Sequence, residues 1–177
     1  MNSPLVSFTE ISPNKTSPRN HTIDTITIHC TAGHLNVRAL GTHFADKNQQ
    51  ASSNYGIDDE GRIALYVDEA DRSWCSSNAA NDNRAITIEV SSDGFPPYAV
   101  TDSAYASLIY LVADICKRNS IKKLRWSHDK ALLNKLDDNS ELKQNITLHK
   151  WFANKACPGP YLEERMFDIV AKVNALL

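Results

Sequence analysis

Hydrophobic and polar residues alternate in two stretches of the chain, and that alternation is the period of a half-buried β-strand. In TIDTITIHC, residues 22–30, two isoleucines share one face while threonines and His29 lie on the other. In AITIEV, residues 85–90, the apolar residues again share a face, and Glu89 lies on the opposite face with a threonine. The pattern therefore predicts two strands, each with a chemically capable side chain near its end.

Helical and hairpin patterns lie between and after these strands. Residues 36–47 have apolar side chains at helical spacing, and residues 52–67 predict an antiparallel hairpin that turns at residues 59–61. Thr101 is a suitable N-cap for a long helix that ends near Asn119. The remaining predictions are a strand at 121–128, a short helix at 129–136 and a closing helix at 161–177. Strands that alternate with helices in this way predict a three-layer α/β domain with a central mixed β-sheet flanked by helices.

Composition divides the chain into an arm and a domain. Residues 1–21 are rich in Ser, Pro, Asn and Thr with little periodicity, so we expect an extended arm laid over the surface. Residues 22–177 form one domain, because 177 residues with 42% hydrophobic content can bury a core without staples. The four cysteines lie far apart and form no CxxC pair, although a disulfide from Cys30 to Cys75 stays open.

Charge and hydropathy narrow the function classes. The formal net charge is -2, from 19 basic and 21 acidic residues, and no basic run is long enough to follow a nucleic acid. No apolar run approaches the roughly 18 residues that span a membrane. The first 20 residues also lack the apolar core of a secretory signal, so we expect synthesis in the cytoplasm.

The candidate chemistry gathers near the C-terminus, in HKWFANKACPGPY at residues 149–161. His149 precedes Cys157 by eight positions, and a Pro-Gly-Pro turn after the cysteine could hold its thiolate rigidly. A hydrolytic metal site takes three ligands from His, Cys and carboxylates and leaves a fourth position for water. The alternative is that Cys157 is a small buried apolar residue and His149 an ordinary loop histidine.

Three further residues extend this candidate site. His29 lies at a strand end, where α/β sheets place their sites, although a hydrogen-bonded core histidine is the alternative. Glu89, inside an apolar strand, would have a raised pKa suited to a general base unless Arg84 or Arg62 pairs with it. Lys155 could stabilise a developing oxyanion, and its alternative is a solvated surface lysine.

Other residues compete for these tasks. We expect three of the remaining histidines, His21, His34 and His43, to be structural or solvent-facing, while His128 is a rival metal ligand because it follows an apolar run. The residues also permit a cysteine hydrolase in which Cys30 or Cys157 is the nucleophile.

Four motifs, TITIHCTAG, ASSNYGIDDEGRI, NRAITIEV and HKWFANKACPGPYL, occur in an order and spacing that resemble a known family. The family is the zinc-dependent N-acetylmuramoyl-L-alanine amidases of type 2, which are similar to peptidoglycan-recognition proteins and include phage endolysins and bacterial autolysins. The resemblance covers roughly residues 22–175. It implies a peptidoglycan-recognition-protein-like fold, with a central mixed sheet, flanking helices and a zinc at the floor of a groove.

The resemblance also implies the roles of individual residues. It makes His29, His149 and Cys157 the ligands of Zn²⁺, Glu89 the general base, and Lys155 the group that polarises the substrate carbonyl. The implied reaction is hydrolysis of the amide between N-acetylmuramic acid and the L-alanine of the stem peptide. The chain has Ser53 where animal relatives often have a catalytic tyrosine, and Asn54 where other bacterial members have a histidine.

The expected partner is bacterial peptidoglycan, with no nucleic acid and no membrane span, and we expect a monomer. An endolysin of this kind would reach the cell wall after release by a holin or by lysis. A non-catalytic muropeptide-binding module of the same fold is the alternative function, and Cys157 argues against it because such members typically lose the metal cysteine.

Overall fold

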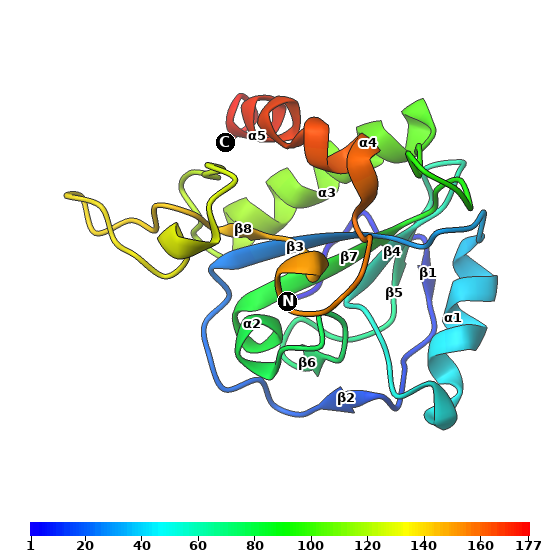
Figure 1. Ribbon diagram of the computed structural model, residues 1–177. Helices are drawn as coiled ribbons and strands as arrows, with labels where there is room; N and C mark the ends of the chain where they lie inside the picture. The colour runs from blue at the N-terminus through cyan, green and yellow to red at the C-terminus, as the bar shows by residue number, and fades with distance from the viewer.

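The computed structural model describes all 177 residues, which are built around a six-stranded sheet (Figure 1). The strand order is β1-β5-β4-β7-β3-β8. The strands are β1 (Phe8–Thr9), β3 (Thr25–Cys30), β4 (Tyr55–Ile57), β5 (Ile63–Leu65), β7 (Ala85–Val90) and β8 (Ile146–Thr147). All neighbouring pairs are parallel except β4 with β5, which form the predicted hairpin. The sheet is therefore mixed.

Helices cover both faces of this sheet. One face packs against α3 (Asp102–Arg118), α4 (Gly159–Glu164) and α5 (Met166–Asn174), which lie above the sheet in Figure 1. The other layer holds α1 (Val37–Ala45), α2 (Ala79–Arg84) and a small antiparallel pair, β2 (Lys15–Thr16) with β6 (Arg72–Ser73). The predicted three-layer α/β architecture is confirmed.

The two faces of the central strands differ in chemistry, as their alternation predicted. The isoleucines of β3 and β7 are fully buried in the core under α3 and α5. On the opposite face, Thr27 and Thr147 share a hydrogen bond of 2.7 Å, and Asn81 of α2 donates to one at 3.0 Å and accepts from the other at 3.0 Å. This buried polar network fixes α2 beneath the strands and satisfies groups that would otherwise be costly to bury.

Predictions for the segment after α3 were wrong in part. Residues 121–128 form no strand, because amide side chains take the place of a strand partner. Asn145 accepts from the Arg125 N–H at 2.7 Å and donates to the Lys123 carbonyl at 3.0 Å, and Asn174 pairs with both backbone groups of Leu124. The strand next to β3 is instead β8, which no pattern indicated.

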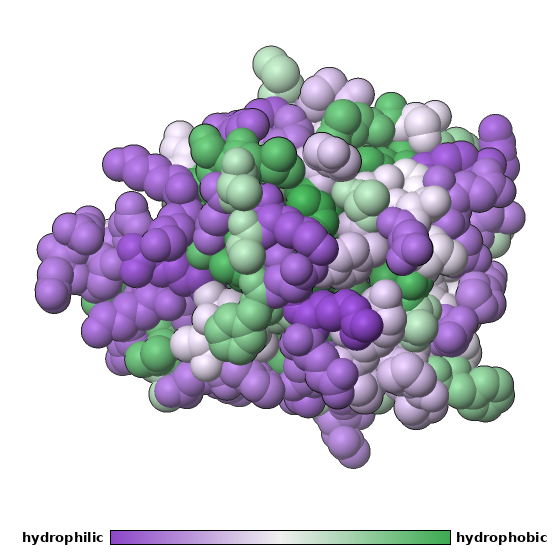
Figure 2. All heavy atoms as spheres, turned by 90° about the horizontal axis from the view of Figure 1, so that it is seen from above, coloured by the Kyte–Doolittle hydropathy of each residue, from purple (hydrophilic) through white to green (hydrophobic).

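Two predicted helices are shorter than expected. Residues 129–136 contain only a 3₁₀ turn, Lys130–Leu132, and the closing helix is divided at Arg165, whose backbone angles of −93° and 0° end α4 before α5 begins. Two further 3₁₀ turns are Lys47–Gln49 and His149–Trp151. The loop between α3 and β8 projects from the body at the left of Figure 1, and Figure 2 shows that hydrophilic side chains cover it.

The first 21 residues lie against the domain. They contribute β1, which pairs with β5 at the edge of the main sheet, and β2, which pairs with β6. Whether the chain divides functionally at residue 21 stays a prediction. No helix combines the length and the apolar character needed to cross a lipid bilayer.

Candidate functional site

His29 and Glu89 lie next to each other at the ends of the two central strands. They are register partners of the parallel pair β3 and β7, so their side chains project from the same polar face. The His29 ring is fully buried, and its Nδ1 lies 3.9 Å from Oε1 of Glu89. The strand alternation therefore brings a buried imidazole and a largely buried carboxyl group together.

The segment from His149 to Cys157 closes over this pair. His149 begins the 3₁₀ turn that follows β8, and the Lys150 N–H donates to the Cys157 carbonyl at 3.2 Å, which ties the two ends of the segment together. Sγ of Cys157 lies 3.3 Å from Nδ1 of His29 and accepts the Cys30 N–H at 3.4 Å. The rings of His29 and His149 meet edge to face, with centroids 5.0 Å apart.

The side chains of His29, His149 and Cys157 fit the geometry of a metal site. Their ligand atoms lie within 4.8 Å of one another. In a tetrahedral zinc site, a sulfur at about 2.3 Å and a nitrogen at about 2.0 Å from the metal lie about 3.5 Å apart, close to the 3.3 Å between Cys157 and His29. Nε2 of His29 and Oε2 of Glu89 are buried without any hydrogen-bond partner. Nε2 of His29 lies across the ring from the Nδ1 atom that faces Cys157, so a metal bound at Nδ1 would leave it unpaired. Because buried polar atoms are normally paired, the orphaned oxygen of Glu89 beside the cluster indicates that the site receives a ligand.

The protonation states also suit a metal. Burial, assisted by the charge of His149, lowers the pKa of His29 to about 3, and burial with Lys155 lowers the pKa of His149. Both imidazoles are therefore neutral at pH 7, as metal ligands must be. A hydrogen bond with Cys30 and burial raise the pKa of Cys157 above its ordinary value, so at pH 7 the side chain is a neutral thiol that would have to give up its proton to bind a metal.

Glu89 has none of the salt bridges that were the alternative for it. Arg84 pairs with Asp24 at 2.5 Å, and Arg62 pairs with Asp58 at 2.7 Å. Burial, and next the neighbouring Cys30, raise the pKa of Glu89 to about 8. The carboxyl group therefore takes up a proton near neutral pH.

The other histidines lie outside this cluster. His128 is exposed and pairs with Glu163 at 2.8 Å, so the structure does not bring this rival ligand to the site. His34 is exposed and lies between Asp59 and Asp93, while His21 and His43 are exposed. All four cysteines are free, which leaves no disulfide between Cys30 and Cys75.

Lys155 lies on the loop before Cys157 with its side chain exposed. Its charge is close enough to His149 to contribute to the lowered pKa of that ring. Among the positions where the sequence departs from relatives, Ser53 and Asn54 are buried beside β7, where both contact the Thr87 hydroxyl. Ser53 and Asn54 therefore have structural contacts with the polar face of β7.

Sequence reasoning missed two residues of the site. The thiol of Cys75 donates to Oε1 of Glu89 at 3.8 Å, and Cys75 with His29 and Glu89 forms a second group of possible metal ligands. The Ser77 hydroxyl lies 3.4 Å from Nε2 of His149. Both belong to the polar loop before α2, and only the docking of α2 under the sheet brings that loop to the strand ends.

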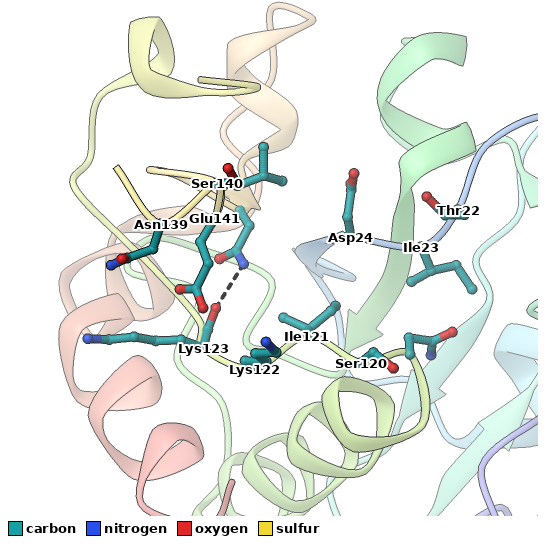
Figure 3. Close-up of a pocket in the computed structure, with 13 residues that line it drawn as sticks. Thr22, Ile23, Asp24, Ser120, Ile121, Lys122, Lys123, Asn139, Ser140 and Glu141 are labelled. Carbon is teal, nitrogen blue, oxygen red and sulfur yellow. Dashed lines mark hydrogen bonds between the residues drawn. The ribbon is translucent and has the colours of Figure 1, made fainter. Parts of the chain in front are cut away.

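A cavity of about 380 Å³ lies elsewhere, between the start of β3 and the end of α3 (Figure 3). Asp24, Lys123 and Glu141 are among the side chains that line it. None of its lining residues belongs to the His29, His149 and Cys157 cluster. This cavity is therefore separate from the cluster, which lies at the other end of β3.

The chain is also similar in sequence to a known protein family. The sequence model described as N-acetylmuramoyl-L-alanine amidase matches residues 19–160, which include all five candidate site residues. A search of curated proteins finds no match.

Solved structures with the same fold include PlyL, an endolysin and AmpD. A glutamate-to-alanine mutant of PlyL has a TM-score of 0.67 at 14% identity and covers 94% of this chain and 97% of its own. A mutant endolysin from Bacillus subtilis has a TM-score of 0.65 at 18% identity, with 95% and 99% covered. AmpD, solved as its selenomethionine derivative, has a TM-score of 0.66 at 18% identity, with 100% and 99% covered. At these identities the likeness establishes a shared fold.

Proposed function

Since this chain belongs to the N-acetylmuramoyl-L-alanine amidase family, we propose that its peptidoglycan amidase activity depends on one zinc ion held by His29, His149 and Cys157. The enzyme hydrolyses the amide between N-acetylmuramic acid and the L-alanine of the stem peptide. The single observation that carries the zinc site is the convergence of two neutral imidazoles and one thiol on a common point, with 3.3 Å between Cys157 and His29. Bound there, zinc supplies a Lewis acid that activates water and polarises the scissile carbonyl.

Glu89 is the proposed general base. Its carboxyl group lies beside His29, and its Oε2 atom has no partner in the protein. A raised pKa near neutrality lets a carboxylate accept the proton of the attacking water and then pass it to the leaving amine. Cys75 donates to Oε1, the Glu89 oxygen that lies 3.9 Å from Nδ1 of His29, and so holds the carboxyl group beside the cluster.

Lys155 is the proposed stabiliser of negative charge on the carbonyl oxygen. It is carried by the same short loop as Cys157, so its ammonium group approaches the site from the solvent side. Such charge stabilisation strengthens as substrate excludes water from the site. The exposure of Lys155 allows it to reach substrate without first breaking an ion pair, because it has none in the structure.

A nucleophilic role for Cys157 is disfavoured by the same surroundings. Reactive cysteines have a lowered pKa and an adjacent base. The pKa of Cys157 is instead raised, by its contact with Cys30 and by burial. The neighbouring His29 has a pKa of about 3 and is a poor proton acceptor near neutral pH. These features suit a metal ligand.

The expected site of action is the bacterial cell wall, since endolysins share the fold and peptidoglycan is the family substrate. The prediction of a monomer and the prediction of cytoplasmic synthesis followed by release both stay open.

Mass spectrometry of digested peptidoglycan tests this proposal. Purified sacculi are incubated with the protein, with and without a zinc chelator, and released peptides are sequenced. We expect stem peptides with a free N-terminal alanine that disappear under chelation and return when zinc is added. Cleavage that survives complete removal of metal would overturn the zinc site, and absence of cleavage in several wall types would favour a binding module.

A further inference from the structure

A cavity of about 630 Å³ lies on the same side of the sheet as the catalytic cluster, and the amidase reaction does not use it. Its walls are α2, the loop after the 3₁₀ turn Lys130–Leu132, the end of the arm and Phe152. Its lining includes Thr25, Asn78, Ala80, Asn134 and Phe152. Of these five residues, Asn78, Ala80 and Asn134 lie outside the four family motifs.

The cavity adjoins the catalytic cluster on two sides. Asn78 follows Ser77, whose hydroxyl lies 3.4 Å from Nε2 of His149. Phe152 ends the 3₁₀ turn that His149 begins, and its N–H donates to the His149 carbonyl at 2.9 Å. Thr25, in the cavity wall, precedes His29 by four residues of β3, which places the two about 13 Å apart along the strand. The face of β3 between Thr25 and His29 is covered by α2, so a chain molecule would pass from one site to the other over Ser77, Asn78 and Phe152, whose side chains are at least partly exposed.

The lining has the chemistry that binds neutral sugars. Amide side chains offer both donors and acceptors, which suits hydroxyl and acetamido groups. The Asn134 side chain is exposed and makes no hydrogen bond within the protein, and the Nδ2 group of Asn78 is free while its Oδ1 caps α2. The Phe152 ring adds an apolar wall, as ligand pockets combine apolar surface with a few convergent polar groups.

The two parts of the substrate, stem peptide and glycan strand, differ in charge. The stem peptide carries carboxylates, whereas the glycan strand of peptidoglycan is neutral apart from its peptides. Arg84, the one guanidinium in the cavity wall, is bound at two points by Asp24, and His21 lies 3.9 Å from the same carboxylate. The cavity therefore presents little free charge and favours the glycan over the peptide.

We propose that this cavity is a subsite for the N-acetylated glycan strand of peptidoglycan, extending from the amide at the zinc cluster toward α2. The inference rests on the proposed function, because it assigns the neighbouring part of the same substrate. It predicts that the enzyme prefers a stem peptide attached to several sugars over one attached to a single N-acetylmuramic acid.

Two variants test the subsite by kinetics. Ala80→Trp fills the cavity from the exposed face of α2, and Asn134→Ala removes the free amide. The quantity compared is kcat/KM on a peptide carried by four or more sugars, divided by kcat/KM on the N-acetylmuramoyl peptide. We expect Asn134→Ala to lower this ratio by about threefold to tenfold, the size of one lost hydrogen bond, and Ala80→Trp to lower it further.

Matched controls lie on other surfaces. Ala106→Trp places the same side chain on an exposed alanine of α3, and Asn139→Ala removes an exposed amide of the same projecting loop on the side of the Figure 3 cavity. Both should keep the wild-type ratio. Melting temperatures of all four variants show whether each is folded, and the ratio of two substrates cancels a general loss of active protein.

A binding measurement separates the subsite from catalysis. The probe is a tetramer of β-1,4-linked N-acetylglucosamine, which has acetamido sugars and no peptide, titrated into ¹⁵N-labelled protein. We expect shifts of the Asn78 and Asn134 side-chain amides and of the Phe152 backbone amide, all weakened in Ala80→Trp. The proposal is overturned if both pocket variants keep the wild-type ratio, or if free stem peptide shifts these signals and the tetramer does not. If the wild-type protein cleaves neither substrate, the proposed function fails, and the titration still decides the sugar subsite.

Discussion

At the scale of single residues, Glu89 carries a charge that the fold opposes. Its carboxyl group is 16% exposed, and its pKa is raised to about 8. In the metal-free protein the native state then keeps a proton that the unfolded chain has already released. The free energy of unfolding should therefore fall as pH rises from about 4.5 to about 8. A nearby metal cation would relieve this cost.

Glu89→Gln tests this conflict and the catalytic role together. Above pH 8 the metal-free variant should be more stable than the metal-free wild type by roughly 2–4 kcal/mol, and near pH 4 the two should be equal. Denaturant unfolding across this pH range measures the difference. Turnover should fall by about 10²- to 10⁴-fold while zinc is retained. The control is Glu60→Gln, at a carboxylate that is 71% exposed, and it should change neither the free energy of unfolding nor the turnover. Undiminished turnover in Glu89→Gln would show that Glu89 is not the general base.

Cys157 is the residue on which the metal depends most. Cys157→Ser should lose zinc and activity together, because a hydroxyl replaces the one anionic ligand of the set. Cys116→Ser, at a buried thiol in the core of α3, should lower stability yet keep the metal. Elemental analysis of purified, dialysed protein gives the zinc content. A Cys157→Ser protein that holds one zinc per chain with wild-type affinity would contradict the assignment.

Proton release offers an independent measure of the same ligand. Below its raised pKa Cys157 is a thiol, and the pKa values of both imidazoles are lowered, so at pH 7 the cysteine is the one ligand that must give up a proton. Zinc titrations by calorimetry in buffers of different ionisation enthalpy count the protons released. Because Glu89 also holds a proton near pH 7, the titration is made on Glu89→Gln. We expect about one proton released per zinc in that variant, and zinc binding without proton release would mean that Cys157 does not bind the metal.

At the scale of elements, the turn that joins the Cys157 loop to α4 depends on Gly159. Its φ is +80°, and an added Cβ would lie 2.7 Å from the Tyr98 ring and 3.2 Å from the Pro97 carbonyl oxygen. Backbone strain and collision act together, so Gly159→Ala should destabilise the protein by about 1–3 kcal/mol and weaken zinc binding. Gly94→Ala is the matched control, since its Cβ would meet nothing closer than 3.7 Å. Equal melting temperatures and zinc affinities in the two variants would show that the turn tolerates a side chain.

The elements also show how far sequence reasoning reaches. The strands that hold His29 and Glu89 were predicted because their alternation is strict, and α3 was predicted with its cap, since the Thr101 hydroxyl accepts the Ala104 N–H at 3.1 Å. The segment 121–128 was also predicted to be a strand, from Ile121, Leu124 and Trp126, but its backbone is bound by amide side chains from residues far along the chain. Pattern alone does not distinguish these two ways of satisfying a buried backbone.

The candidate site was accessible from sequence to a similar extent. The convergence of His29, His149 and Cys157 agrees with the ligand set that the resemblance implied, although their roles stay predictions. Cys75 and Ser77 were missed because their proximity to the site arises from the tertiary docking of α2. Spacing along the chain contains no record of that docking.

At the scale of the whole molecule, the arm at residues 1–21 completes the fold without contributing to the catalytic cluster. The Ser3 N–H donates to the hydroxyl of fully buried Tyr55 at 2.9 Å, and β1 covers the outer edge of β5. The Arg19 guanidinium donates to backbone carbonyls of Glu69, Asp71, Asn83 and Ala85, and so joins the loops around β6 and α2 to β7. These contacts are spread over three parts of the domain.

Removal of residues 1–21 should therefore separate stability from chemistry. The truncated chain keeps every proposed ligand and the base, so its folded fraction should cleave peptidoglycan at low temperature. Its free energy of unfolding should be lower by several kcal/mol, because buried carbonyls lose their donors and an edge strand is exposed to pairing with other chains. Arg19→Ala should reproduce part of this loss, whereas Lys117→Ala, at an exposed lysine of α3, should not. Thermal melts and light scattering on the three proteins measure the effect, and a truncated chain as stable and monodisperse as the full chain would establish residues 22–177 as a self-sufficient domain.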